Sequence, residues 1–288
     1  MKYMLLALFV GFLSNPLNAQ NGGISKAEEI SMSASFEDYA KLKGGMTQDI
    51  VSTSSWKRTV YRTVSKDKLM NSLFFNPVES GDKEVNLFSL LINVAGEQND
   101  VPVYKFQYTE NDKNPLQPTH ISAILKQHSI PYTTKGSTNI SVSNSDLPTN
   151  RVSTYHIKEV WYFDTKTNRG GVKVDAICPV LDVVKAEDRS TGKVTKVPMC
   201  WIPFDCIAPY LLNTTVYLTD EMKAKCNNSI KDQTMFEYIA NRHYSGEIYQ
   251  VDNSILAEHY KAGESLAELQ NTVEAWLSAV ENNFKRFK

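Results

Sequence analysis

The sequence predicts an α+β fold in which an antiparallel, hairpin-centred sheet is flanked by helices, the last of them long and C-terminal. Three observations support this class. Residues 155–181 alternate apolar and polar side chains in two arms, short helical and strand-like segments surround them, and residues 265–284 carry one apolar stripe with helical spacing. The antiparallel hairpin at the centre argues against a doubly wound parallel sheet.

The hairpin at Tyr155–Leu181 has the clearest pattern. One face of its first arm carries Tyr155, Ile157, Trp161 and Phe163, interrupted by Glu159, and the other face carries His156, Lys158, Tyr162 and Asp164. In the second arm Val172, Val174, Ala176 and Cys178 alternate with Lys173, Asp175 and Ile177. The loop ends in Gly170 and Gly171, which adopt positive φ at little cost. We therefore predict two strands, the first with one buried face.

Shorter elements surround the hairpin. Residues 56–64 fit a helix and a strand equally well, so the type of this element is left open. Helices are predicted over 87–94, ended by Gly96, over 119–128 and over 235–242, and strands over 101–108 and 247–251. Residues 197–204 form a strand that needs an edge position or a bulge, because Pro198 and Pro203 cannot donate a backbone hydrogen bond.

The C-terminal helix is predicted from its start, its stripe and its end. Ser265 and Glu268 form a capping box. The apolar stripe consists of Leu266, Leu269, Val273, Trp276, Val280 and Phe284. The basic residues Lys285, Arg286 and Lys288 suit the negative end of the helix dipole.

The N-terminus reads as an export signal. Lys2 precedes an apolar segment, Met4–Leu13, and Ala19 offers a small residue at the cleavage point. The apolar segment is about half the length that a membrane span needs. We predict a signal peptide at 1–19, a flexible extension at 20–47, and one domain at 48–288 with a candidate internal boundary at the polar linker 137–150. Because residue 20 is Gln and no Cys lies near it, attachment to a membrane would need a partner.

Composition and cysteine usage narrow the classes of partner and of cysteine chemistry that the chain can have. Basic and acidic residues nearly balance, with a net charge of −1, which favours neither nucleic acid nor an anionic membrane surface as a partner. Four cysteines in an exported chain are disulfide candidates with unknown pairing: Cys178, Cys200, Cys206 and Cys226. For Cys178 the alternative is a small buried apolar residue. The absence of a C-x-x-C motif disfavours zinc.

No residue pattern in the sequence indicates catalysis, a cofactor or a metal. The phosphate-binding glycine motifs, the G-x-S-x-G motif and the H-E-x-x-H motif do not occur. His156 lies on the polar face of the hairpin, where a single histidine is ordinarily a solvated side chain. We therefore predict that the protein is not an enzyme.

Aromatic residues suggest contacts with other proteins. If Trp161 and Phe163 face the core, Tyr162 points the other way and becomes a candidate interface residue, as does Trp201. The alternative for each is packing within the subunit.

Several segments together resemble the GldN/PorN family, the ring component of the type IX secretion and gliding-motility machinery of Bacteroidetes. Besides the hairpin, they are WKRTVYRTV (56–64), LFFNPVE (73–79), NLFSLL (86–91), VYKF (103–106), MCWIPF (199–204) and MFEYIANRHYSGEIYQVDN from Met235 onward. They appear in the family's order and cover essentially the whole chain after the leader. The cysteines and the prolines Pro198 and Pro203 do not match a pattern of the family.

The resemblance implies a periplasmic protein without catalytic residues. Such a protein assembles with a PorK/GldK-type lipoprotein, and with copies of itself, into a ring beneath the outer membrane, and the ring is coupled to the PorL/PorM-type (GldL/GldM-type) motor. Two alternatives are a secreted monomeric binding or adhesin module and, less favoured, an exported hydrolase. Whether the chain is the main ring subunit or an auxiliary paralogue is left open.

Overall fold

The computed structural model describes residues 56–76, 78–80, 83–98, 101–108, 116–136, 139–164, 169–216, 220–225, 233–258 and 265–286. The chain divides into two units, Met1–Gly45 and Met46–Lys288, and the described residues all belong to the second. The predicted signal peptide at 1–19 and the predicted extension at 20–47 lie outside the described residues.

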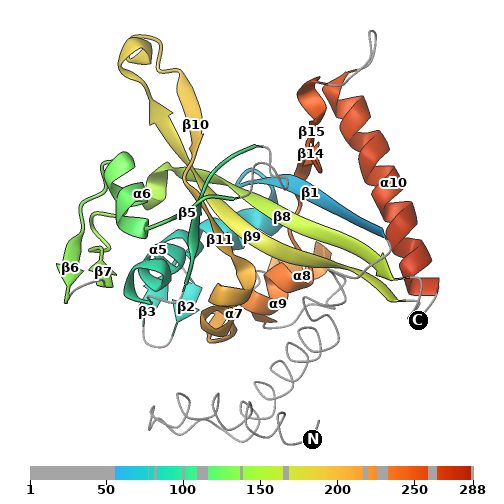
Figure 1. Cartoon of the computed structure of the whole chain (residues 1–288), viewed down its shortest axis with the longest axis horizontal. Coiled ribbons are helices and arrows are strands. Elements are labelled where there is room, and N and C mark those ends of the chain that lie inside the picture. Colours follow the sequence, from blue (N-terminus) through green and yellow to red (C-terminus); the bar gives the residue numbers. More distant parts are fainter. Residues whose placement is uncertain are drawn as a thin grey trace, which may run out of the picture. The chain divides into compact units, whose positions relative to one another are not determined.

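A nine-stranded sheet is the largest feature of the described part (Figure 1). Its strands follow the order β15-β14-β1-β8-β9-β11-β4-β5, with β10 also paired to β9, and neighbouring strands are antiparallel. Their bounds are β1 Trp56–Ser65, β4 Val103–Lys105, β5 Pro118–Thr119, β8 Val152–Asp164, β9 Arg169–Val184, β10 Val194–Pro198, β11 Cys200–Pro203, β14 Glu247–Val251 and β15 Ser254–Ile255. The predicted α+β class is confirmed.

Two small sheets and several helices complete the described part. The strands of the small sheets are β2 Val78–Ser80, β3 Lys83–Val85, β12 Thr214–Val216 and β13 Gln233–Thr234 in one, and β6 Thr133–Lys135 and β7 Asn139–Ser141 in the other. The α-helices are α4 Ser72–Phe75, α5 Leu87–Glu97, α6 Ile121–Gln127, α7 Phe204–Leu212, α8 Asp220–Lys225, α9 Met235–Ala240 and α10 Leu266–Arg286. The 3-10 helices are η1 Leu69–Asn71, η2 Thr149–Arg151, η3 Ala186–Asp188 and η4 Leu256–Glu258.

The predicted hairpin is confirmed as β8 and β9, but both of its faces are buried. Trp161 and Phe163 pack under α10, as the alternation predicts. On the opposite face Lys158, Val160 and Tyr162 are also buried. The prediction of a single buried face was wrong because side chains pack on both faces of the sheet, in the cluster beneath α10 on one face and in the cluster around Trp201 on the other.

A bulge divides the second arm between the two faces. Lys158 is paired with Ala176 but Glu159 with Val174, so Asp175 is an extra residue of β9. Val172 consequently packs under α10, while Cys178 belongs to a cluster on the other face. The predicted common face of this arm was wrong for this reason.

The undecided segment 56–64 is the strand β1. It is paired with β8 over its full length, from Trp56 opposite Phe163 to Ser65 opposite Thr154. Its even-numbered residue Val60 lies in the cluster under α10, and its odd-numbered neighbour Tyr61 lies in the cluster on the other face. A strand buried on both faces has no polar face to show its period, which explains the ambiguity of the sequence.

Gly96 does not end α5, which continues to Glu97. The Cβ of any other residue at position 96 would lie 2.7 Å from the carbonyl oxygen of Ile140 in β7. The glycine therefore permits close packing of a strand on the helix. Ile140, Val142 and Leu147 are buried, so the predicted linker at 137–150 contributes to the core.

Other predicted elements are confirmed with changed bounds. The helix at 119–128 is α6, the helix at 235–242 is α9, and the strand at 247–251 is β14. The strand at 101–108 shortens to β4. The proline-containing strand is interrupted at Met199 into β10 and β11, as a bulge requires.

The C-terminal helix α10 has the predicted capping box and packs on the sheet. The backbone N–H of Ser265 donates to Oε2 of Glu268 at 2.7 Å, and the N–H of Glu268 donates to Oγ of Ser265 at 3.2 Å. Leu277 of α10 is completely buried in a cluster with Val60 and Trp161. None of the described helices has the length and apolar character that crossing a membrane requires.

Candidate functional site

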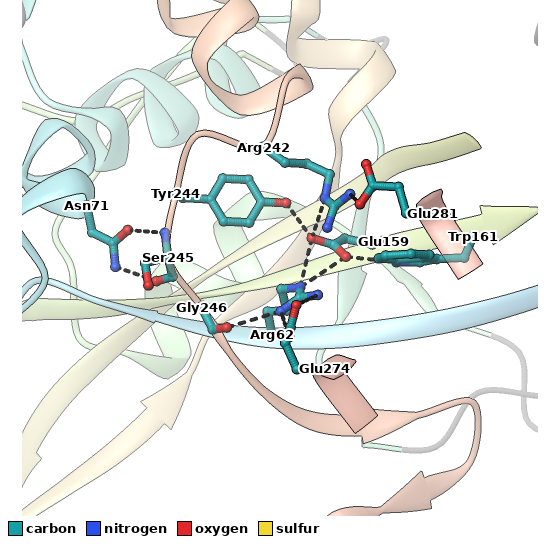
Figure 2. A network of polar contacts seen from close by, with 10 residues as sticks. All are labelled: Arg62, Asn71, Glu159, Trp161, Arg242, Tyr244, Ser245, Gly246, Glu274 and Glu281. Carbon is teal, nitrogen blue, oxygen red and sulfur yellow. Dashed lines mark hydrogen bonds and ion pairs between the residues drawn. The ribbon is translucent and has the colours of Figure 1, made fainter. Parts of the chain in front are cut away.

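A fully buried carboxylate, Glu159, lies at the centre of a polar network beneath α10 (Figure 2). Its oxygens accept hydrogen bonds from Tyr244 Oη at 2.7 Å and from Trp161 Nε1 at 2.9 Å. Two guanidinium groups also donate to it, Arg62 Nε at 3.1 Å and Arg242 Nε at 3.3 Å. Four donors from three separate parts of the chain therefore converge on one side chain.

Arg62 of β1 connects Glu159 to the C-terminal helix. Its Nη1 donates to Glu274 Oε2 at 2.6 Å and its Nη2 to Glu274 Oε1 at 3.2 Å, a two-pronged contact with α10. Nη1 also donates to the carbonyl oxygen of Gly246 at 3.2 Å. The guanidinium group thus contacts β8, α10 and the loop before β14.

Arg242 makes the second connection to α10. Its Nη1 donates to Glu281 Oε2 at 3.3 Å, and its guanidinium carbon lies 4.7 Å from the centre of the Trp161 ring. Its backbone has a φ of 57°, a left-handed conformation that is unfavourable for a residue with a Cβ. We name Arg62, Glu159, Trp161, Arg242, Tyr244, Glu274 and Glu281 together the clasp.

Asn71 holds the loop that supplies Tyr244 to the clasp. Its side chain donates to the carbonyl oxygens of Ser65 and Ser245, both at 2.7 Å, and accepts from the N–H of Ser245 at 2.8 Å. Asn71 is completely buried, and its amide has partners at both ends. The loop is therefore fixed relative to β1.

The electrostatics of the clasp keep its groups charged. Burial alone raises the pKa of Glu159, but the charges of Arg62 and Arg242 and the hydrogen bonds from Tyr244 and Trp161 outweigh burial, and the pKa lies below its ordinary value. Burial alone lowers the pKa of Arg62, but the contacts with Glu159 and Glu274 outweigh burial and raise the pKa above its ordinary value. This guanidinium therefore also stays charged.

The clasp is arranged to hold elements together. Two cations and three carboxylates satisfy one another within the chain, and the tyrosine hydroxyl donates to the central carboxylate. A low pKa at Glu159 and two permanently charged arginines leave these groups poorly suited to proton transfer near neutral pH. The arrangement defines a structural connection between the sheet and α10.

The structure buries both predicted interface residues. Tyr162 in β8 points away from Trp161, as predicted, but it is only 2% exposed, and Trp201 in β11 is 1% exposed. The expectation that Tyr162 projects into solvent was wrong because the second face of β8 is also covered. Replacing Tyr162 with Ala would consequently destabilise the fold, so the variant is not a clean test of assembly.

Trp201 lies in an aromatic cluster on the sheet face opposite the clasp. Its ring is 5.6 Å from that of Phe106 and 5.9 Å from that of Tyr61. His156 lies beside them, with its ring 4.7 Å from that of Tyr249 and its Nδ1 3.3 Å from Oγ1 of Thr63. Burial, helped by the positive charge of Lys196, lowers the pKa of His156 to about 4. The solvated histidine expected from the sequence is therefore a partly buried, neutral one.

Two of the predicted disulfide candidates are buried thiols in the structure, Cys178 and Cys200. Trp201 shares a cluster with Cys178, and Cys200 is paired with Lys105 of β4. Cys206 lies half-buried in α7, and Cys226 is outside the described residues. Whether Cys206 or Cys226 takes part in a disulfide, and with which partner, stays a prediction.

The described residues contain no group of three or more histidine, cysteine or acidic side chains placed to hold a metal ion. One feature of the sequence indicates the clasp, namely that Glu159 interrupts the apolar face of β8. It could not indicate the partners, because Arg62 lies 97 residues and Tyr244 lies 85 residues from Glu159 along the chain.

The described part of the chain is an α+β fold, and comparison with known proteins assigns the chain to a motility family. The family model described as gliding motility associated protein GldN matches residues 51–280. The chain belongs to the GldN family, which confirms the resemblance found in the sequence. Membership makes it an envelope-associated component of the gliding-motility and type IX secretion machinery. No curated protein matches the chain.

Proposed function

We propose that this protein is a non-enzymatic subunit of the periplasmic ring of the type IX secretion and gliding-motility machinery. In this role it assembles with a PorK/GldK-type outer-membrane lipoprotein and with copies of itself, and the ring is coupled to the PorL/PorM-type motor. The observation that carries the proposal is the family match over residues 51–280, which includes the nine-stranded sheet and most of α10.

The clasp is consistent with a part that bears load between subunits. A motor-coupled ring transmits force, and the two arginines of the clasp join α10 to the sheet by charge-assisted hydrogen bonds in addition to apolar contact. The charged groups of the clasp contact one another within the chain, which favours a structural role over a hydrolytic one.

The proposal also places the protein in the periplasm, held at the outer membrane by its partner. The predicted signal peptide at 1–19 and the lack of a cysteine near its end support this location.

Purification of the native protein from cell envelopes, followed by negative-stain microscopy, tests the proposal. Rings on outer-membrane sheets that contain this chain and the lipoprotein are expected. A soluble complex with one copy of each protein as the sole product would contradict the ring role. Monomers recovered outside the cell would favour the adhesin alternative instead.

A further inference from the structure

Beyond the ring role, the structure carries two unlike surfaces that suit each other. One is a projecting β-ribbon formed by the end of β9 and by β10, and the other is the sheet edge around β14, η4 and the start of α10. We propose that the ribbon of one copy docks on this edge of the next copy, and that this head-to-tail contact builds the ring. The inference rests on the proposed ring function and specifies the surfaces that would make it.

The ribbon extends beyond the rest of the sheet (Figure 1). Strand β8 begins at Val152, opposite Leu181, so residues 182–184 of β9 are paired with β10 only. Val184 and Val194 are paired with each other there and are 46% and 51% exposed. Two exposed valines on a strand pair without a covering layer contribute little to the core of their own chain, and they form an apolar surface for another.

The tip of the ribbon has a fixed shape. The N–H of Asp188 donates to the carbonyl oxygen of Lys185 at 3.0 Å, and the N–H of Gly192 donates to that of Asp188 at 2.8 Å. Gly192 has a φ of 66°, which favours glycine at this turn. A pre-ordered tip loses little conformational entropy when it binds.

The ribbon is also basic. Residues 183–197 contain four basic and two acidic side chains. Lys185 and Lys193 are exposed and adjoin Val184 and Val194. The apolar pair is therefore bordered by positive charge, with the charged groups at the rim where interfaces ordinarily have them.

The edge around β14, η4 and α10 has the opposite charge. The described residues of this stretch, 247–258 and 265–280, contain five acidic side chains and no lysine or arginine. Among the acidic residues, Glu247, Glu258 and Glu268 are exposed. One large apolar side chain at the start of α10, Leu266, is exposed as well, at 37%.

The partner expected at this edge is a second copy of the chain, because the ribbon is basic and the edge is acidic. The ribbon and α10 are well separated in the fold (Figure 1), so one chain does not bring its own two surfaces together. A contact between two different surfaces is heterologous, and repeating it produces a closed ring or an open filament, whereas contact between identical surfaces stops at a dimer. Opposite charges also orient the approach and disfavour ribbon-to-ribbon pairing.

Charge reversal tests the contact in the full chain without its leader, reconstituted with the lipoprotein partner. The ribbon variant carries Lys185→Glu and Lys193→Glu, and the edge variant carries Glu247→Lys and Glu258→Lys. Glu268 is left unchanged because it caps α10. Each variant is expected to need at least about tenfold more protein to form assemblies larger than a heterodimer. The matched control, Lys66→Glu with Lys68→Glu, changes two exposed lysines elsewhere and should assemble normally.

The decisive measurement is whether assembly recovers when the two charge reversals are combined. An equal mixture of the ribbon and edge variants restores opposite charges at every contact, as does one chain with all four changes, so both should assemble again. Thermal unfolding of each variant should match that of the wild-type protein, since the four side chains are exposed. Normal rings from either single variant, or no recovery in the mixture, would overturn the contact and leave the ring function intact. A wild-type protein that never exceeds a heterodimer would instead overturn the ring function itself.

Discussion

At the scale of single residues, the position of Glu159 determines what its neighbours must be. A carboxylate removed from water is stable only where donors replace the water, and here two arginines, a tyrosine and a tryptophan do so. The sequence showed that Glu159 interrupts an apolar face. It could not show why, since the explanation lies in residues far away along the chain.

Replacing Glu159 with Gln should destabilise the protein by about 3 kcal/mol, because the buried Arg62 and the half-buried Arg242 would lose their shared counter-charge. The free energy of unfolding in urea measures the change. Glu187→Gln, at an exposed site on the ribbon, is the control and should stay within about 0.5 kcal/mol of the wild-type protein. Equal stability of both variants would mean that the arginines find other partners.

Arg242 offers a comparison in which glycine should surpass alanine. Both Arg242→Ala and Arg242→Gly lose the clasp contacts, but only glycine relieves the left-handed backbone, so Arg242→Gly should be the more stable by about 1 kcal/mol. At the neighbouring Asn241, where φ is −83°, the order of the same two substitutions should be reversed. Urea unfolding of the four variants measures both differences. Alanine as the more stable substitution at position 242 would show that the left-handed conformation is abandoned with the side chain.

His156 should make the protein less stable in mild acid. Its pKa falls from about 6.5 when unfolded to about 4 in the fold, so between these pH values the unfolded chain binds the extra proton. Stability is therefore fully present above about pH 6.5 and is lost as the pH falls toward about 4. Relative to His156→Gln, the wild-type protein should lose roughly 2 kcal/mol over that range, measured by urea unfolding at several pH values. Parallel pH profiles would show that the imidazolium is accommodated.

At the scale of elements, the sequence predicted most of the helices and strands that a local pattern determines, either a hydrophobic period or a capping motif. The hairpin and α10 were predicted correctly because an alternation and a capping box are local signals. The type of β1 was left open and the faces of β9 were assigned wrongly, because burial on both sides removes the polar stripe and a bulge shifts the alternation by one residue. Both errors come from neighbouring strands that no local pattern reveals.

The substitution Gly96→Ala tests whether helix propensity or packing against a neighbouring strand dominates at this position. Helix propensity alone predicts that Gly96→Ala stabilises α5 by about 1 kcal/mol. The 2.7 Å approach of Ile140 predicts the reverse, a loss of about 1–3 kcal/mol, because the strand β7 would have to move. Thermal unfolding distinguishes the two. Asn93→Ala, in the same helix, is the matched control that gains propensity with no close approach, and a more stable Gly96→Ala variant would show that β7 shifts freely.

At the scale of the whole molecule, the family match identifies the motility system to which the protein belongs, and the structure shows which of the described side chains are exposed to solvent. The candidate site could not have been assembled from the sequence, because its members come from β1, β8, the loop before β14 and α10. The interface predictions were likewise limited, since the aromatic residues that stand out in the sequence are those that fill both sides of a wide sheet. Val184 and Val194 did not stand out in the sequence, and Leu266 and Trp276, which the sequence placed in the apolar stripe of the last helix, are exposed, whereas Leu277 is buried.

The two buried thiols should report opening of the entire core. Burial raises the pKa of Cys200 to about 12 and raises that of Cys178 well above its ordinary value, and neither thiol is exposed. Both should resist alkylation in the native protein, react in denaturant and show no disulfide with each other. Mass spectrometry of alkylated peptides, with and without denaturant, measures this. Rapid labelling of either cysteine in the native protein would reveal local opening of the sheet.

The clasp also sets when the fold can be finished. Arg62 and Glu274 are separated by 212 residues, so the bond between them closes one of the longest loops that the chain can form. Folds dominated by contacts of such long sequence separation fold more slowly than folds with local contacts. The buried Leu277 of α10 also packs against Val60 and Trp161. The core beneath this helix is therefore incomplete until residues near the end of the chain are in place.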